Sequence, residues 1–197
     1  MAERPLIYFI RHGLTDWNIT RRIQGQAERD ITEVGRMQAT RNGEKLLTLI
    51  GAGTDYDFVA SPMRRTRETM ERVRHAMRLD PTSYRTDDRL MELNFGDWQG
   101  LTEEEINSNR PEDIIARSRD KWRFIPPGQH AESYEMLSIR FENWLQSVNQ
   151  KTVCVTHGGC IRTLFYLYGG LPKEKAANIS IPQDKVLRYS PDGLEWL

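Results

Sequence analysis

Three short apolar runs divide the chain, and each one ends where small or polar residues begin. They are LIYFI at 6–10, FVA at 58–60 and TVCV at 152–155. Short continuous runs of this kind are typical of strands that are buried on both faces, and each is followed by a stretch compatible with a helix. This alternation of strands and helices predicts an α/β fold with a mostly parallel central sheet.

The stretches beside these runs predict helices and one more strand. The expected helices cover residues 34–50, 62–79 and 133–148. The first is the weakest because Gly43 lies inside it, and Pro62 suits the first turn of the second. The third places its apolar side chains on one helical face. The run VLRY at 186–189 is the expected final strand.

The region 101–131 interrupts this alternation with prolines and many charges. We expect it to be a cap-like insertion over the edge of the sheet, with some helix, and not a separate domain. A length of 197 residues fits one domain. The prediction is therefore a single domain over residues 1–197.

Charge and cysteine content narrow the class of protein. Lys plus Arg and Asp plus Glu both number 28, which argues against a general nucleic-acid or membrane binder. Two cysteines, Cys154 and Cys160, are too few for a secreted disulfide scaffold, so we expect buried thiols and a reducing compartment. The apolar run at the N-terminus is short and broken by Arg11, unlike a signal peptide or a membrane span. These features predict a cytoplasmic protein.

Histidines stand directly after two of the predicted strands. His12 lies between Arg11 and Gly13, and His157 begins the sequence His-Gly-Gly. Ligands of open α/β sheets bind at the carboxyl ends of strands, so both imidazoles are expected there. His12 also fits a residue that merely caps a strand end. A metal site is the competing interpretation, but no HExxH pair or Cys/His cluster supports it, and the neighbouring arginines disfavour a cation.

The segment SPMRRTR at 61–67 begins the helix after the second strand. A helix N-terminus attracts anions, and arginine reinforces the attraction. A solvated basic face is the alternative, and we prefer it for Arg64 and Arg67. Arg65 is interpreted as a phosphate ligand because of the motifs that follow.

Four motifs occur in order along the chain. They are RHGLTDWN with RIQG and ITEVG behind it, ASPMRRTRET, LMELNFGDWQG and VTHGGCIR, and a weaker one, PPGQHAES, precedes the long helix. Together they resemble the histidine phosphatase superfamily, in its phosphoglycerate mutase-like branch, from about residue 6 to residue 170. The resemblance implies a three-layer αβα sandwich and an enzyme that cleaves phosphate monoesters without a metal or a cofactor.

The resemblance also implies roles for individual residues. His12 matches the nucleophile that forms a phosphohistidine, and Glu92 matches the proton donor. The residues that match the surroundings of the phosphoryl group are Arg11, Arg65 and His157. The positions that match contacts with phosphate or substrate are Thr15, Asn18, Gln24 and Gly158. The implied partner is a small phosphorylated substrate, and the oligomeric state stays open.

Physical chemistry supports this set of residue types. A phosphoryl group in transfer carries negative charge on its oxygens, which guanidinium groups and an imidazole N–H stabilise. The nucleophile must be a neutral imidazole nitrogen whose other nitrogen is held by a hydrogen bond. The leaving alkoxide needs a proton, which Glu92 is placed to give if apolar neighbours such as Leu90 and Leu93 favour its protonated form.

Other functions fit the sequence less well. A cysteine-dependent phosphatase needs Arg six positions after its Cys, where this chain has Cys160 after Cys154. A non-catalytic binding module would be expected to lack at least one of the matched residues. A mutase shares the same chemistry, but mutases of this family carry a longer insertion after the glutamate motif than the segment between Glu92 and His157 provides.

The substrate stays open at this point between sugar phosphates, phosphoglycerate-like acids, nucleotide-derived esters and phosphoproteins. The insertion carries a group of cations, Arg110, Arg117, Arg119, Lys121 and Arg123, with Trp122 among them. Such a group contacts an acidic substrate or forms a solvated face, and the second is more common. His130, in the loop before the long helix, is read as an exposed residue.

Overall fold

The computed structural model describes residues 5–197, and these fold around one six-stranded sheet. The strands are β1 (Ile7–Arg11), β2 (Asp57–Ala60), β3 (Arg85–Thr86), β4 (Thr152–Thr156), β5 (Val186–Ser190) and β6 (Gly193–Trp196). They lie in the order β3-β2-β4-β1-β5-β6, with β5 and β6 antiparallel and the other four parallel. The mostly parallel sheet is therefore confirmed. Residues 1–4 of the predicted domain lie outside the described residues.

The three apolar runs form the centre of this sheet, as predicted. All five residues of β4 are buried, and in β1 only Arg11 is partly exposed. Alternate side chains of β1 enter different cores, because successive residues of a strand point to opposite faces. Tyr8 and Ile10 belong to one core, while Ile7 and Phe9 belong to the other.

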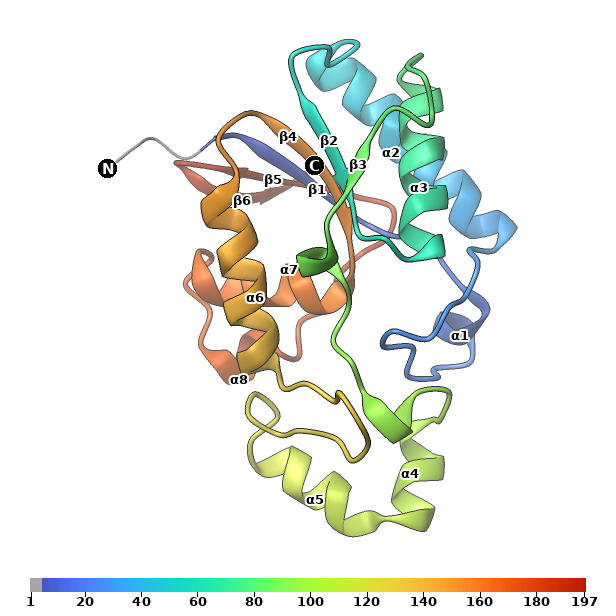
Figure 1. Cartoon of the computed structure of the whole chain (residues 1–197), viewed down its shortest axis with the longest axis vertical. Helices are drawn as coiled ribbons and strands as arrows, with labels where there is room; N and C mark the ends of the chain where they lie inside the picture. The colour runs from blue at the N-terminus through green and yellow to red at the C-terminus, as the bar shows by residue number, and fades with distance from the viewer. Residues whose placement is uncertain (1–4) are drawn as a thin grey trace.

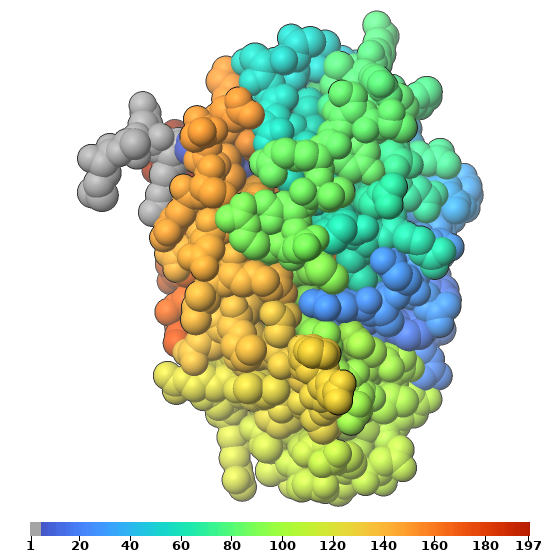
Figure 2. Space-filling model, in the orientation of Figure 1, coloured from blue at the N-terminus to red at the C-terminus, as the bar shows by residue number. Residues whose placement is uncertain are grey.

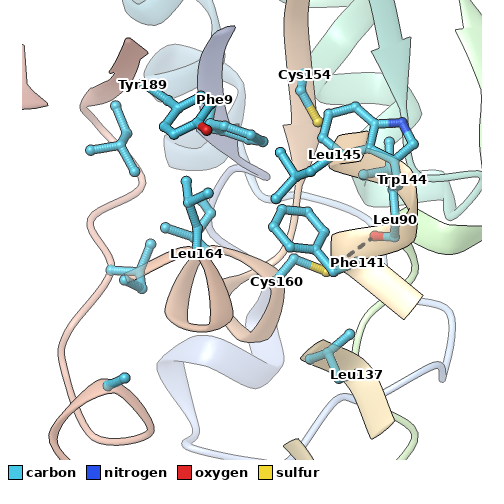
Figure 3. Packing of buried hydrophobic residues seen from close by; sticks show 14 of the residues in the cluster. Phe9, Leu90, Leu137, Phe141, Trp144, Leu145, Cys154, Cys160, Leu164 and Tyr189 are labelled. Atoms are coloured by element: carbon cyan, nitrogen blue, oxygen red, sulfur yellow. Dashed lines mark hydrogen bonds between the residues drawn. The ribbon is translucent and has the colours of Figure 1, made fainter. Parts of the chain in front are cut away.

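Helices cover both faces of the sheet, which gives three layers (Figure 1). They are α1 (Asp16–Ile19), α2 (Glu33–Ile50), α3 (Arg64–Ala76), α4 (Glu103–Asn109), α5 (Pro111–Arg119), α6 (Tyr134–Ser147), α7 (Gly158–Leu167) and α8 (Lys173–Ala176). Helices α2 and α3 pack on one face through residues such as Leu46 and Val73. Helices α6 and α7 pack on the other, where Phe141, Trp144 and Leu164 surround Phe9 (Figure 3). The predicted three-layer αβα sandwich is confirmed.

The sequence contains a glycine within α2 and a proline near the start of α3, and the structure shows how each is accommodated. Gly43 stays inside α2 because a Cβ there would lie 2.5 Å from the Val73 carbonyl oxygen of α3, so the glycine lets the two helices approach closely. Pro62 lies outside the first turn that was predicted for it. Helix α3 begins at Arg64, and Met63 is its N-cap residue.

The end of the chain differs from the prediction of one final strand. The expected strand is β5, but β6 follows and pairs with it antiparallel. The short turn after Ser190 and the positive φ of Gly193 (123°) let the chain reverse direction there. Within residues 5–197, no helix combines the length and the apolar character needed to cross a membrane.

The 101–131 segment contains helices α4 and α5, so the predicted helical content is correct. Its position is not the one predicted. Figure 1 shows both helices beyond the carboxyl ends of β2 and β4, on the same side as α1, and not along edge strand β3 or β6. The segment is anchored there by hydrogen bonds to the loop after α1, including Arg22 to Glu105 and Ile23 N–H to the Leu101 carbonyl. The cap therefore borders the end of the sheet where ligands bind.

Loops from three distant parts of the sequence meet on one face of the molecule, near this end of the sheet. Figure 2 shows the segment after α1 (blue) against the segment around residues 90–100 (green) and the loop before α6 (gold). Gln26 holds the first two together, since its side chain donates to the Glu92 carbonyl at 3.0 Å and its backbone N–H donates to Gln99 Oε1. These loops surround the candidate site.

Candidate active site

The parallel pairing of β1 with β4 brings the two predicted histidines together. Arg11 lies opposite Thr156 in the register, so His12 and His157 both follow directly at the carboxyl ends of neighbouring strands. Their ring centroids are 5.3 Å apart, and the two residues are 2% and 0% exposed. The backbone N–H of His12 continues the ladder by donating to the Thr156 carbonyl.

His12 is held as a neutral imidazole with a defined tautomer. Its Nδ1 lies 2.9 Å from the carbonyl oxygen of Gly13, which can only accept, so Nδ1 carries the proton and Nε2 keeps its lone pair. Burial, and then the charges of Arg65 and Arg11, hold the pKa of His12 well below its ordinary value. The geometry therefore presents Nε2 as a nucleophile at neutral pH.

His157 is oriented by Ser61, which follows β2. The His157 Nε2 lies 2.8 Å from the Ser61 hydroxyl, and both residues are fully buried. Burial, then Arg65 and His12, lowers the pKa of His157 well below its ordinary value. A hydroxyl that donates to Nε2 leaves the proton on Nδ1, a buried atom with no partner in the described part of the chain. That N–H is free to bind a ligand.

Arg65, which is fully buried, and Arg11, which is partly exposed, form no ion pair with a carboxylate of the described residues. Arg65 donates to the carbonyls of Ala27 at 2.9 Å and Gly25 at 2.7 Å, and Arg11 donates to the carbonyl of Ile181 at 2.8 Å. In each, Nε is buried without a partner among residues 5–197. Burial is the main cause that lowers the pKa of both arginines to about 10, so both stay charged at neutral pH. The positive charge suits an anion such as phosphate.

Glu92 reaches the same site from the segment after β3. Both of its carboxyl oxygens lie 3.1 Å from the backbone N–H of Gly159 in the first turn of α7, and Oε1 also accepts from Leu93 N–H at 2.9 Å. A Cβ at Gly159 would overlap Oε1, so only glycine allows this approach. Leu90 and Leu93 are buried as expected, and the Glu92 carboxyl group is in addition held by two backbone N–H donors.

The four residues predicted to contact phosphate or substrate differ in their position and in their hydrogen-bond partners. Thr15 and Asn18 form the capping box of α1, so the Thr15 hydroxyl is used inside the protein. Gln24 is buried, and its Oε1 has no partner within the described residues. Gly158 lies against Arg11, where a Cβ would be 3.5 Å from the arginine Nε. The structure thus brings Gly158 to the charged centre, places Gln24 next to Gly25, whose carbonyl accepts from Arg65, and gives Thr15 and Asn18 a supporting position.

Sequence reasoning missed several residues that support the site. Gln183 donates to the His12 carbonyl at 2.9 Å and to Asn18 Oδ1 at 3.1 Å. Arg140 of α6 donates to the carbonyl oxygens of residues 89, 91 and 92 and pairs with Glu132 at 2.8 Å, which fixes the Glu92 segment. Neither residue lies in a motif, so no local signal marks them. Ser61 did lie in the second motif, but its role as the His157 partner depends on a contact between strands.

The remaining polar candidates lie outside this centre, as the sequence predicts. Arg64, Arg67 and His130 are exposed, and His130 adopts a positive φ of 59° in its loop. Cys154 and Cys160 are buried free thiols. Among the described residues, no group of three or more His, Cys, Asp or Glu side chains is arranged to hold a metal ion.

Comparison with known proteins gives one consistent family. The model of the histidine phosphatase superfamily (branch 1) matches residues 7–196. Phosphoglycerate mutase-like protein 4 of Arabidopsis thaliana is 35% identical over 201 residues, covering 96% of this chain and 81% of that protein. Glucosyl-3-phosphoglycerate phosphatase of Mycobacterium tuberculosis is 35% identical over 120 residues, covering 61% of this chain and 50% of that one.

A solved structure matches the fold over almost the whole chain. The mycobacterial glucosyl-3-phosphoglycerate phosphatase in complex with VO3 superimposes with a TM-score of 0.76 at 26% identity, covering 98% of this chain and 96% of that one. The similarity in sequence and the similarity in structure therefore lead to the same family, which contains both phosphatases and mutase-like proteins by name.

The two neutral histidines predict a loss of stability in acid. An unfolded chain takes up protons on both imidazoles below about pH 6.5, whereas the folded protein keeps them neutral because its pKa values are lowered. The unfolded state then binds more protons, so the free energy of unfolding falls as the pH drops below that value. Each histidine is expected to contribute about 1.4 kcal/mol per pH unit.

Urea unfolding at a series of pH values between about 7.5 and 5.5 measures this effect. His12→Asn should reduce the slope of stability against pH by the share of one histidine, while Gln129→Asn in an exposed loop should leave it unchanged. An identical slope in the wild type and in His12→Asn would contradict the neutral, buried state of His12.

Proposed function

Because the chain belongs to the histidine phosphatase superfamily (branch 1), we propose that it hydrolyses a small phosphate monoester through a phosphohistidine intermediate on His12. One observation carries the proposal. A neutral imidazole, with its proton fixed on Nδ1 by the Gly13 carbonyl, lies beside two arginines that have no carboxylate partner in the described structure. A phosphoryl group supplies the negative charge that this centre lacks.

In the first step, His12 Nε2 attacks phosphorus and the bond from phosphorus to the ester oxygen breaks. Arg11, Arg65 and the free N–H of His157 stabilise the charge on the transferring oxygens. Glu92 gives its proton to the leaving alkoxide. The proton has to be on the carboxyl group before this step.

In the second step, water takes the phosphoryl group from His12. Glu92, now ionised, accepts a proton from the attacking water, and the bond from phosphorus to Nε2 breaks. The products are inorganic phosphate and the neutral imidazole with which the cycle began. Arg140 supports both steps as a positioning residue, because it holds the carbonyl oxygens around Glu92 in place.

Phosphoglycerate mutase-type transfer is the alternative, with the same residues. A mutase has to exclude water while the group is passed back to the substrate. The cap of this chain, α4 and α5, is short, which favours hydrolysis. A non-catalytic phospho-ligand module is the second alternative. Binding without turnover would support it.

We also propose that the chain works as a single domain in the cytoplasm. Both faces of one sheet are covered by helices from the two halves of the sequence, and helices α4 and α5 are tied to the α1 loop. The two cysteines are unpaired, as expected for a reducing compartment.

Substituting His12 tests the intermediate. With a labelled phosphate ester in excess chelator, rapid quenching at alkaline pH should trap one acid-labile phosphoryl group on His12 in the wild type. His12→Ala should lose this adduct and on the order of 10⁴-fold or more of the turnover, since a nucleophile is removed. His130→Ala, which changes an exposed histidine, is the matched control and should label normally. Full turnover by His12→Ala would rule out the proposal.

Phosphorus NMR separates hydrolysis from transfer. With 3-phosphoglycerate, or with any ester found active in a screen, release of inorganic phosphate should exceed movement of the phosphoryl group between hydroxyls, with or without 2,3-bisphosphoglycerate as a primer. The reason is the access that a short cap leaves to water. Rapid interconversion of 2- and 3-phosphoglycerate with little free phosphate would favour the mutase instead.

Glu92→Gln tests the proton donor. Alkyl phosphates have poor leaving groups, so the variant should lose about 10²–10⁴-fold on them in single-turnover formation of phosphohistidine, and much less on an aryl phosphate with an acidic phenol. Glu104→Gln, at an exposed acid of α4, is the control and should match the wild type. Equal losses on the two ester types would assign Glu92 a different role.

A further inference from the structure

Two backbone N–H groups hold the Glu92 carboxyl group in a way that distinguishes its two oxygens. Oε1 accepts from the Leu93 N–H at 2.9 Å and from the Gly159 N–H at 3.1 Å. Oε2 lies 3.1 Å from the same Gly159 nitrogen and has no further donor among the described residues. Because a carboxyl oxygen has two lone pairs, two donors occupy those of Oε1. The proton of the acid therefore belongs on Oε2.

Other side chains fix the backbone that carries this carboxyl group. Arg140 donates to the carbonyl oxygens of Met91 and Glu92 at 2.8 and 3.2 Å. Gln26 donates to the same Glu92 carbonyl at 3.0 Å. The backbone is thus tied from two directions, so a displaced carboxyl group has to move about the side-chain bonds of Glu92.

Position 159 has no room for a side chain beside the acid. A Cβ at Gly159 would overlap Oε1 of Glu92 and would lie 3.1 Å from Leu137 Cδ2. The preceding position differs, since a Cβ at Gly158 would make an ordinary contact, 3.5 Å from Arg11 Nε. The atom that a methyl group at position 159 would meet is the end of a flexible side chain. The methyl group would therefore displace the carboxyl group and leave the backbone of α7 in place.

The carboxyl group lies beside the arginines of the site without pairing with them. Burial lowers the pKa of Arg65 to about 10, and the charge of Glu92 is the largest effect that opposes this shift. Burial and the charge of Arg162 lower the pKa of Arg11 to about 10, and Glu92 again acts in the opposite direction. The acid is therefore close to the proposed position of the phosphoryl group, and no cation of the described residues forms an ion pair with it.

We propose that Gly159 is a positioning residue for the proton donor: its N–H and that of Leu93 keep Oε1 as an acceptor, so that Oε2 carries the proton. The inference rests on the proposed function of the His12 site. When the bond from phosphorus to the ester oxygen breaks, its electron pair stays on that oxygen, which takes the proton from Oε2. The two N–H groups stabilise the carboxylate that forms. In the second step, Oε2 takes a proton from the attacking water.

Gly159→Ala tests the position of the acid. In a single turnover, formation of phosphohistidine from an alkyl phosphate should fall on the order of 10²-fold, because a displacement of about 1 Å can have an effect of this size. An aryl phosphate with an acidic phenol depends little on the proton and should react at close to the wild-type rate. Gly43→Ala is the matched control, since its methyl group would meet the Val73 carbonyl between α2 and α3. It should keep the wild-type ratio of the two rates.

The double variant Glu92→Gln/Gly159→Ala separates positioning from a structural role. Once Glu92→Gln has removed the proton, Gly159→Ala has nothing left to misplace, so the losses of the two single variants on the alkyl phosphate should not multiply. A structural role predicts losses that do multiply. That result, or equal losses of Gly159→Ala on the two ester types, would overturn the proposal.

The amide resonance of Gly159 gives a measurement that needs no change at position 159. A carboxylate oxygen forms a stronger hydrogen bond than an amide oxygen and shifts the N–H proton farther downfield. Glu92→Gln should therefore move the Gly159 amide proton upfield, while Glu104→Gln, at an exposed acid of α4, should leave it unchanged. An unmoved resonance in Glu92→Gln would contradict the contact on which the proposal depends.

The proposed function and the role of Gly159 fail in different ways. If Gly159→Ala still forms phosphohistidine on His12 and keeps the wild-type ratio between alkyl and aryl esters, only the role of Gly159 is overturned. Absence of phosphohistidine with every ester in the wild type would count against the function itself. Thermal unfolding of Gly159→Ala and Gly43→Ala separates a change in rate from a loss of folded protein.

Discussion

The pairing of β1 with β4 at the centre of the sheet determines the position of the chemistry. These parallel strands are buried on both faces, and their register sets Arg11 opposite Thr156. A shift by one residue would turn the side chains of β1 to the opposite faces and separate the two imidazoles. The neighbouring strand, β2, is followed directly by Ser61, which orients His157. The apolar cores on both sides of the sheet therefore hold the histidines at a fixed separation, and β1 and α3 add the positive charge of Arg11 and Arg65.

The arginines of the site carry positive charge that a bound anion would neutralise. Arg11 and Arg65 are held by backbone carbonyl oxygens, which orient guanidinium groups without cancelling their charge. A carboxylate of the protein paired with each arginine would stabilise the protein without a ligand. It would also compete with phosphate for the guanidinium group. The one acid in the centre, Glu92, binds instead to the N-terminal turn of α7. Positive charge and a carboxyl group thus lie in one site with no ion pair between them among the described residues.

Local sequence signals predicted the central strands and the main helices well, because burial on both faces and helical spacing are properties of short windows. They failed where a distant contact decides the outcome. Gly43 was expected to weaken α2, yet its missing Cβ is what lets α3 pack against it. The surroundings of Glu92 depend on Gly159, and Gln183 joins His12 to Asn18 from far along the chain. Such contacts have no local pattern, and only the motif resemblance marked the residues that meet in the site.

The histidines lie at the ends of the strands, whereas the cap is a separate segment, and this separation affects substrate specificity. In the proposed reaction, residues at the strand ends handle the phosphoryl group, which is the same in every ester, whereas the cap lies toward the leaving group, which varies. The loop of residues 178–181 contacts both parts, since the Ile181 carbonyl accepts a hydrogen bond from Arg11 and the Asn178 side chain accepts one from Lys121. A substrate group that contacts the cap would therefore also steady the loop that orients Arg11. Binding energy from the remote part of a substrate is then available to position the reacting phosphate, which is how such energy contributes to rate.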